Sequence, residues 1–170
     1  VEAYKDYIEL AQSGKEIQEI VKRGKIAMIM MLMSGLIDNN LETLRKYRAK
    51  GLTVMALCHL GAMNWSDSTA ELNKIPGLTE FGREVVAECN DLGILIDLAH
   101  ASDETCFNAL ETSTRPMIVT HSKCRALSNS MRDISDDLMR KVAGQGGVVG
   151  ILAPAPRTGH EAQKSRLRRD

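Results

Sequence analysis

The sequence has no excess of one charge and no apolar run long enough to cross a membrane. Its 22 Lys and Arg residues balance 22 Asp and Glu residues, so no net field attracts a nucleic acid or an anionic membrane surface. The longest apolar run covers residues 26–33, whereas a membrane-spanning helix needs roughly 20 apolar residues. We therefore expect neither a nucleic-acid partner nor a transmembrane segment.

Cysteine is also scarce, and its four copies stand far apart in the chain. No Cys-x-x-Cys pair occurs among them, which disfavours a zinc knuckle and a dense disulfide scaffold. Reduced thiols and a cytoplasmic location follow as the simplest expectation. The first residue is Val rather than Met, so a removed leader or a chain fragment is the alternative, and a secreted or membrane-anchored protein stays open.

Short apolar runs alternate with helical patterns through most of the chain. Strand-like runs occupy residues 25–32, 52–57, 94–98, 117–120 and 147–152, and helix-like patterns occupy residues 2–23, 40–50, 79–92, 102–111 and 135–144. This alternation is typical of βα units around a parallel sheet, and it predicts the α/β fold class. A (β/α) barrel and an open doubly wound sheet both fit. No GxGxxG or GxxxxGKS/T motif follows a strand, which disfavours the nucleotide-binding open sheets.

The alternating pattern ends near residue 153. We expect one α/β domain at residues 1–153 and a basic, disordered tail at residues 154–170, where the periodicity is lost. Residues 61–76 form a polar loop longer than most connections, and long loops on rigid scaffolds are frequently functional. Thr79, Ser102 and Ser135 stand where the N-caps of three helices are expected.

Three of the four histidines stand at the ends of predicted strands. His59 follows the run TVMALC, His100 follows ILIDLA, and His121 follows MIVT. The C-terminal ends of parallel strands converge on one rim, where ligands bind. A single histidine at such a place is more frequently a hydrogen-bonded structural residue, because each buried ring nitrogen needs a partner. Three together favour a catalytic or metal site.

Two of these histidines suit one metal ion. His100 and His121 come from neighbouring strands and could hold one cation, and zinc accepts neutral imidazole in catalytic sites with an open position. His59 could instead polarise a substrate or stabilise a developing oxyanion. Arg132, in the loop after the fourth strand, could clamp a carboxylate through its planar guanidinium. An arginine that is simply solvent-exposed in the loop is an equally good interpretation of Arg132.

Longer motifs give these residues a family context. The segments that carry it are GKIA, LETLRKYRAKGLTVMALCH, NWSDS, GLTEFGREVVAECNDLGILIDLAHASDETCFNALETSTRPMIVTHSKCRAL and MRDISDDLMRKVAGQGGVV. Together they resemble the renal or membrane dipeptidases, the M19 zinc peptidases. The most specific parts are LIDLAH and THS with their 21-residue interval. The similarity covers most of residues 16–151.

The resemblance implies a TIM-type (β/α)8 barrel, of which about five βα units are present, with a binuclear zinc centre that hydrolyses dipeptides. His100 and His121 match the two histidine ligands of one zinc ion. His59 matches the histidine near the scissile carbonyl, and Arg132 matches the arginine that binds the C-terminal carboxylate of the substrate. Because the family is commonly dimeric, the resemblance also implies a possible homodimer.

The chain departs from the family pattern at its carboxylates. The resemblance places a His-x-Asp zinc-binding pair on the first strand, but no such pair occurs in this sequence. A glutamate that bridges both metals belongs near Leu32 and Met33, where no carboxylate stands. The last strand, with an aspartate that serves the attacking water, belongs beyond residue 170.

The sequence therefore predicts a zinc-dependent dipeptidase that is truncated or impaired in this chain. A catalytically inactive dipeptidase-like fragment with a binding or structural role is the alternative. A lactonase or amidase barrel is less favoured, because Arg132 and the following SDD helix start match the dipeptidase pattern.

Overall fold

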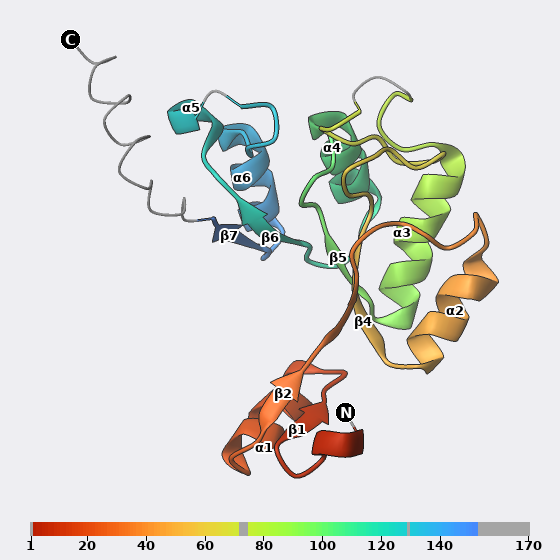
Figure 1. The fold of residues 1–170 in the computed structure, drawn as a ribbon. Coiled ribbons are helices and arrows are strands. Elements are labelled where there is room, and N and C mark those ends of the chain that lie inside the picture. Colours follow the sequence, from red (N-terminus) through yellow and green to blue (C-terminus); the bar gives the residue numbers. More distant parts are fainter. Residues whose placement is uncertain (1, 72–74, 129, 153–170) are drawn as a thin grey trace, which may run out of the picture.

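The computed structural model describes residues 2–71, 75–128 and 130–152. Within these ranges strands and helices alternate along the chain (Figure 1), in the order 3-10 helix η1 (Glu2–Tyr4), β1 (Ile8–Leu10), α1 (Gly14–Lys22), β2 (Ile26–Met28), β3 (Met30–Leu32), α2 (Leu41–Ala49), β4 (Leu52–Ala56), α3 (Glu80–Leu92), β5 (Leu95–Asp97), α4 (Asp103–Thr112), β6 (Ile118–Ser122), α5 (Arg125–Ser128), α6 (Asp136–Gly144) and β7 (Val148–Ile151). None of the described helices is both long and apolar enough to cross a membrane.

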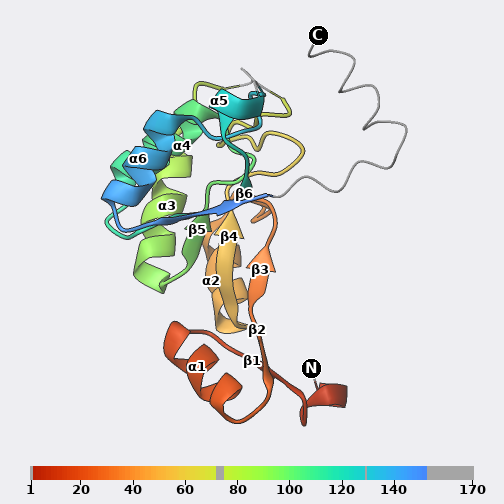
Figure 2. The same cartoon turned by 90° about the vertical axis from the view of Figure 1, so that its left-hand side faces the viewer.

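Five parallel strands form the main sheet, in the order β3-β4-β5-β6-β7. Neighbours in this sheet are also successive in the chain, as in a barrel of βα units. In Figures 1 and 2 the helices α2, α3, α4 and α6 lie on one side of the strands. The described strands form an open arc of a TIM-type barrel, which confirms the predicted α/β class with about five βα units.

The hydrophobic core lies between the sheet and these helices. Met55 in β4, Ile96 in β5 and Val119 in β6 are buried in one cluster with Val85 of α3 and Leu110 of α4. Burying an aliphatic side chain contributes roughly 1.5–3 kcal/mol, so this layer holds the strand ends at fixed positions. The four cysteines are all unpaired.

Three helices begin where the sequence predicts, at Thr79, Ser102 and Ser135. Each of these side chains accepts a hydrogen bond from the backbone amide three residues later, at 3.2 to 3.3 Å. The first amides of a helix have no partner inside the helix, and a cap supplies one. These caps fix the starts of α3, α4 and α6, and therefore the ends of the loops that precede them.

The first 32 residues differ from the sequence prediction. One helix is predicted over residues 2–23, but this segment contains η1, β1 and α1, and β1 pairs in parallel with β2. Pairing between distant segments overrides the local helix propensity here. The strand predicted over residues 25–32 divides into β2 and β3, because β2 pairs with β1 whereas β3 pairs with β4.

Two further differences concern the second half of the chain. The short helix α5 is not among the predicted elements, because four residues give no periodic pattern. The predicted tail at residues 154–170 lies outside the described residues, so the domain boundary at residue 153 stays a prediction.

Candidate active site

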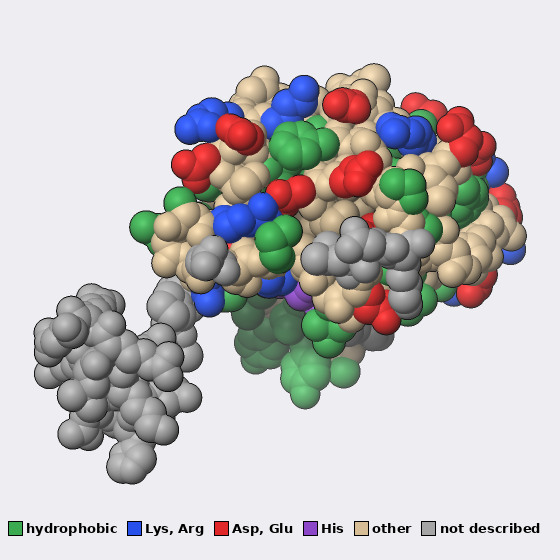
Figure 3. Space-filling model, turned by 90° about the horizontal axis from the view of Figure 1, so that it is seen from above, with side chains coloured by type: hydrophobic (Ala, Val, Ile, Leu, Met, Phe, Trp, Pro, Cys, Tyr) green, Lys and Arg blue, Asp and Glu red, His purple; other side chains and the backbone are tan. Residues whose placement is uncertain are grey.

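The three histidines predicted at strand ends lie together. His59 and His100 stand in the loops after β4 and β5, and His121 lies within β6. The ring centroids of His59 and His100 are 4.3 Å apart, and those of His100 and His121 are 5.0 Å apart. In Figure 3 a histidine side chain reaches the surface between charged and apolar side chains. Three neighbouring strands thus bring imidazole rings to one place on the C-terminal rim.

His100 and His121 approach each other through ring nitrogens. Their Nε2 atoms are 3.1 Å apart. His100 has a φ of +71°, in the left-handed region that few residues other than glycine adopt. Burial and, after it, the positive charge of Arg132 lower the pKa of His100 to about 4. The ring is therefore neutral at pH 7, which is the form that binds a metal ion.

A chain of hydrogen bonds supports His121 from the neighbouring strand. Asp97, fully buried at the end of β5, accepts bonds from the backbone amides of Ala99 at 3.0 Å and Thr120 at 2.9 Å. Asp97 also accepts a hydrogen bond from the hydroxyl of Thr120. The oxygen of this hydroxyl lies 2.8 Å from Nδ1 of His121. Sequence reasoning missed Asp97 and Thr120. Asp97 interrupts the apolar run 94–98, and this was a signal of a hydrogen-bonded site, because a buried carboxylate needs hydrogen-bond donors.

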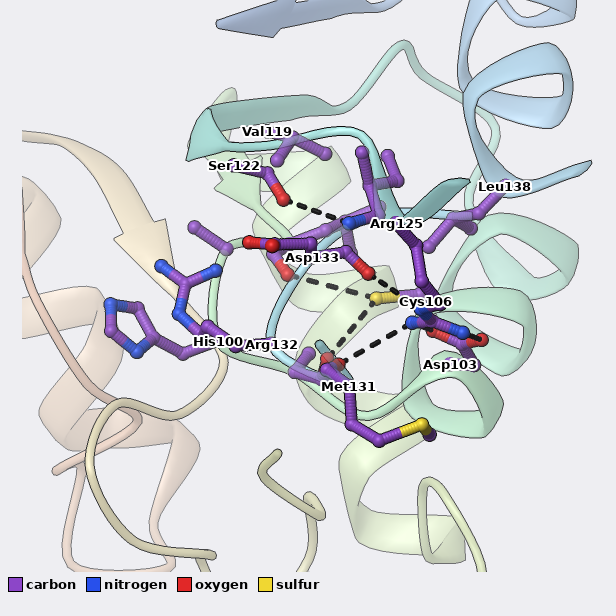
Figure 4. Close-up of a pocket in the computed structure, with 14 residues that line it drawn as sticks. His100, Asp103, Cys106, Val119, Ser122, Arg125, Met131, Arg132, Asp133 and Leu138 are labelled. Carbon is purple, nitrogen blue, oxygen red and sulfur yellow. Dashed lines mark hydrogen bonds and ion pairs between the residues drawn. The ribbon is translucent and has the colours of Figure 1, made fainter. Parts of the chain in front are cut away.

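Arg132 lies beside the histidines, in the loop between α5 and α6. Its guanidinium donates to the backbone carbonyl of His121 at 3.3 Å. None of the salt bridges between described residues involves it. In Figure 4 the guanidinium of Arg132 and the ring of His100 point to the same side of the pocket. The half-buried guanidinium therefore has N–H groups that can donate hydrogen bonds to an anion.

A second arginine holds the loop that carries Arg132. Arg125, the first residue of α5, forms a bidentate ion pair with Asp103 at 2.5 and 2.7 Å. It also donates to the carbonyls of Asp133 at 2.8 Å and Met131 at 3.4 Å. Sequence reasoning missed this arrangement, because it depends on a contact between two helix starts that no local pattern shows.

The two Nε2 atoms suit one metal ion. Two ring nitrogens 3.1 Å apart are close enough for both to contact one zinc ion, because a zinc–nitrogen bond is about 2.0–2.1 Å long. Within the described ranges, no group of three or more His, Cys, Asp or Glu side chains could hold a metal. The resemblance places a bridging glutamate in the segment of Leu32 and Met33, where no carboxylate stands. The donors fit two ligands of one cation and do not fit a binuclear centre.

Known sequences match this chain over most of its length. The sequence model of the family "Membrane dipeptidase (Peptidase family M19)" matches residues 1–158. Dipeptidase 3 of Rattus norvegicus is 33% identical over 133 residues, which are 75% of this chain and 27% of the rat protein. Dipeptidase tcpJ of Claviceps purpurea is 30% identical over 154 residues, 89% of this chain and 36% of that protein. The chain spans well under half the length of these relatives.

Solved structures agree with the sequence match. The probable dipeptidase PvdM from Pseudomonas aeruginosa superposes with a TM-score of 0.86 at 26% identity, over 89% of this chain and 40% of the other. A metallo peptidase from Rhodobacter sphaeroides, liganded with a phosphinate mimic of the dipeptide L-Ala-D-Ala, has a TM-score of 0.78 at 25% identity, over 85% and 43% of the two chains. The chain therefore belongs to the membrane dipeptidase family, peptidase family M19.

Proposed function

We propose that this chain carries the central part of the active site of a zinc-dependent dipeptidase. The observation that supports this most is the 3.1 Å approach of two Nε2 atoms, from His100 and His121. Arg132 stands beside them and has no carboxylate partner among the described residues. The chain also belongs to a family of dipeptidases, which makes a dipeptide the proposed substrate.

His100 and His121 would hold the metal ion, and His59 would act on the substrate. A bound zinc ion supplies a Lewis acid that polarises a carbonyl and lowers the pKa of a bound water. The ring of His59, centred 4.3 Å from that of His100, would donate a hydrogen bond to the oxygen of the scissile carbonyl. Such a donor stabilises the negative charge that develops there during hydrolysis.

Arg132 would bind the C-terminal carboxylate of the substrate. In a dipeptide this carboxylate lies one residue away from the peptide bond, so an arginine next to the histidine pair selects short peptides. A guanidinium forms two parallel hydrogen bonds with a carboxylate, which also fixes its orientation. The Rhodobacter sphaeroides metallo peptidase was solved with a phosphinate mimic of L-Ala-D-Ala, which supports a dipeptide as the ligand class.

Zinc binding can be measured by isothermal titration calorimetry on the metal-free chain. We expect one zinc ion per chain, and a loss of affinity of at least about 10-fold in His100→Ala and in His121→Ala, because each removes one of the two nitrogens. Lys15→Ala on the exposed surface of α1 is the control, which should bind as the unchanged chain does. Equal affinity in all four proteins would contradict the site.

Hydrolysis of L-Ala-D-Ala in the presence of zinc tests the substrate. We expect alanine release, and a KM raised roughly 10-fold or more in Arg132→Lys, because lysine keeps the charge but cannot form the paired hydrogen bonds. Arg140→Lys is the control, since Arg140 pairs with Asp137 on the exposed surface of α6. A KM that does not respond to Arg132→Lys would contradict the assigned role.

A second candidate function is dipeptide binding without hydrolysis. It is favoured by the donor set, because the described residues place no carboxylate with the two imidazoles. Zinc hydrolysis needs a group that takes the proton of the water. Binding of a phosphinate dipeptide mimic without turnover of L-Ala-D-Ala would support this candidate, and turnover would exclude it.

We further propose that the chain forms a homodimer. Strands β3 and β7 are the two edges of the described sheet, and edge strands present unpaired backbone groups that another chain can bind. Exposed apolar side chains stand on both edges, among them Met30 on β3 and Val148 on β7.

A further inference from the structure

We infer that Asp97 and Thr120 determine which nitrogen of His121 carries the proton, so that Nε2 of His121 keeps a lone pair facing His100. Both residues act through His121, which makes them positioning residues. The inference rests on the proposed function for the role of the metal ion. The proton arrangement itself belongs to the metal-free chain.

The carboxylate of Asp97 is the fixed end of this chain of hydrogen bonds. Its Oδ1 accepts from the backbone amides of Ala99 at 3.0 Å and Thr120 at 2.9 Å. Backbone amides only donate, so they hold the buried carboxylate as an acceptor. The second oxygen, Oδ2, accepts the hydroxyl proton of Thr120.

The hydroxyl of Thr120 determines whether Nδ1 of His121 donates or accepts the hydrogen bond between them. A hydroxyl has one proton, and here it is donated to Asp97. Toward Nδ1 of His121, 2.8 Å away, the oxygen of Thr120 can therefore only accept. Nδ1 carries the ring proton as a consequence, and Nε2 carries the lone pair that a metal ion needs.

His100 has the opposite arrangement in the metal-free chain. Two lone pairs 3.1 Å apart repel, so Nε2 of His100 carries a proton and donates it to Nε2 of His121. A cation between the two nitrogens needs a lone pair on both. The proton on Nε2 of His100 then leaves to water, and water returns one to Nδ1, so the ring stays neutral with no net proton release. Metal binding thus changes the tautomer of His100 alone.

Long-range 1H–15N spectra of the chain labelled at histidine, recorded with EDTA and then with zinc, read these tautomers directly. We expect His121 as the Nδ1–H form under both conditions, and His100 to change from Nε2–H to Nδ1–H on adding zinc. Thr120→Val removes the hydroxyl at nearly constant volume. This variant should contain His121 as a mixture of the Nδ1–H and Nε2–H tautomers, and it should bind zinc roughly 10-fold or more weakly. Thr120→Ser should restore both properties.

Two further variants sharpen the test. In Asp97→Asn the amide NH2 donates to Thr120, whose hydroxyl then donates to Nδ1 of His121, so the Nε2–H tautomer should appear. Thr53→Val is the matched control on β4, because the hydroxyl of Thr53 donates to the carbonyl of Gly51 at 3.0 Å. It should leave both histidine tautomers unchanged.

The outcomes separate this inference from the proposed function. An unchanged His121 tautomer in Thr120→Val and Asp97→Asn would overturn the inference, even if zinc binds. A tautomer that depends on Thr120 in a chain that binds no zinc would support the inference and overturn the metal site. If Thr120→Val loses its folded amide spectrum, Asp97→Asn and Thr120→Ser decide the question.

Discussion

The environment of His100 couples folding to pH at the scale of a single residue. Burial lowers its pKa from 6.5 to about 4 in the folded chain. Between these values the unfolded chain binds a proton that the folded chain does not, so the free energy of unfolding decreases as the pH falls. The free energy of unfolding is therefore larger above about pH 6.5 than at pH 4 as far as His100 is concerned.

Replacing His100 should reduce this pH dependence. In His100→Asn the titrating group is removed, and asparagine tolerates the left-handed backbone at this position. We expect the loss of unfolding free energy between pH 7 and pH 5 to be smaller in the variant than in the unchanged chain. Urea unfolding of both proteins with EDTA measures the difference, and an equal loss would contradict the assignment.

Gly35 marks a close approach between a loop and the core. A Cβ at this position would lie 2.3 Å from Cζ2 of Trp65 and 2.6 Å from the carbonyl oxygen of Leu57. Gly35→Ala should therefore lower the free energy of unfolding by roughly 1–3 kcal/mol, the usual cost of overpacking. Gly14→Ala is the control, because nothing lies within 4 Å of its Cβ; chemical denaturation compares the two, and equal stabilities would contradict the clash.

At the scale of elements, Arg125 joins the start of α5 to the start of α4 through its ion pair with Asp103. Arg125→Met should remove these bonds, lower the free energy of unfolding by roughly 1–3 kcal/mol, and loosen the loop that carries Arg132. Hydrogen exchange of peptides from residues 123–134 should accelerate, while exchange in α3 stays unchanged.

Arg140→Met is the matched control for Arg125→Met. Arg140 pairs with Asp137 on the surface of α6, where both side chains are exposed, and such pairs contribute little to stability. Hydrogen exchange in residues 123–134 should not respond to this change. An equal response in both variants would show that Arg125 has no special part in holding the loop.

At the scale of the whole molecule, the open arc predicts self-association through its edges. Val148 and Ile151 on β7 are 65% and 63% exposed. Val148→Lys combined with Ile151→Lys should shift the chain toward the monomer, because charged edge strands resist pairing. Val21→Lys is the control on α1, where Val21 is 58% exposed. Sedimentation velocity over a range of concentrations measures the shift; a chain that is monomeric throughout would contradict the dimer.

Local chemistry in the sequence predicted the elements that depend on neighbouring residues. The caps at Thr79, Ser102 and Ser135 were predictable, because a hydroxyl and an amide three residues later always lie close at a helix start. Strand β1 was not predictable from local chemistry, because its parallel partner β2 is brought to it by the intervening helix α1. A contact between separate segments leaves no trace in local propensity.

The sequence by itself determined the fold class, the family resemblance and the meeting of His59, His100 and His121, because parallel strands in chain order place their C-terminal ends on one rim. Only the tertiary structure decided that Asp97 and Thr120 stand behind His121, and that Arg125 holds the loop of Arg132. These contacts depend on how neighbouring strands and helices are aligned, to within a hydrogen-bond length, which the order of residues along one strand does not specify.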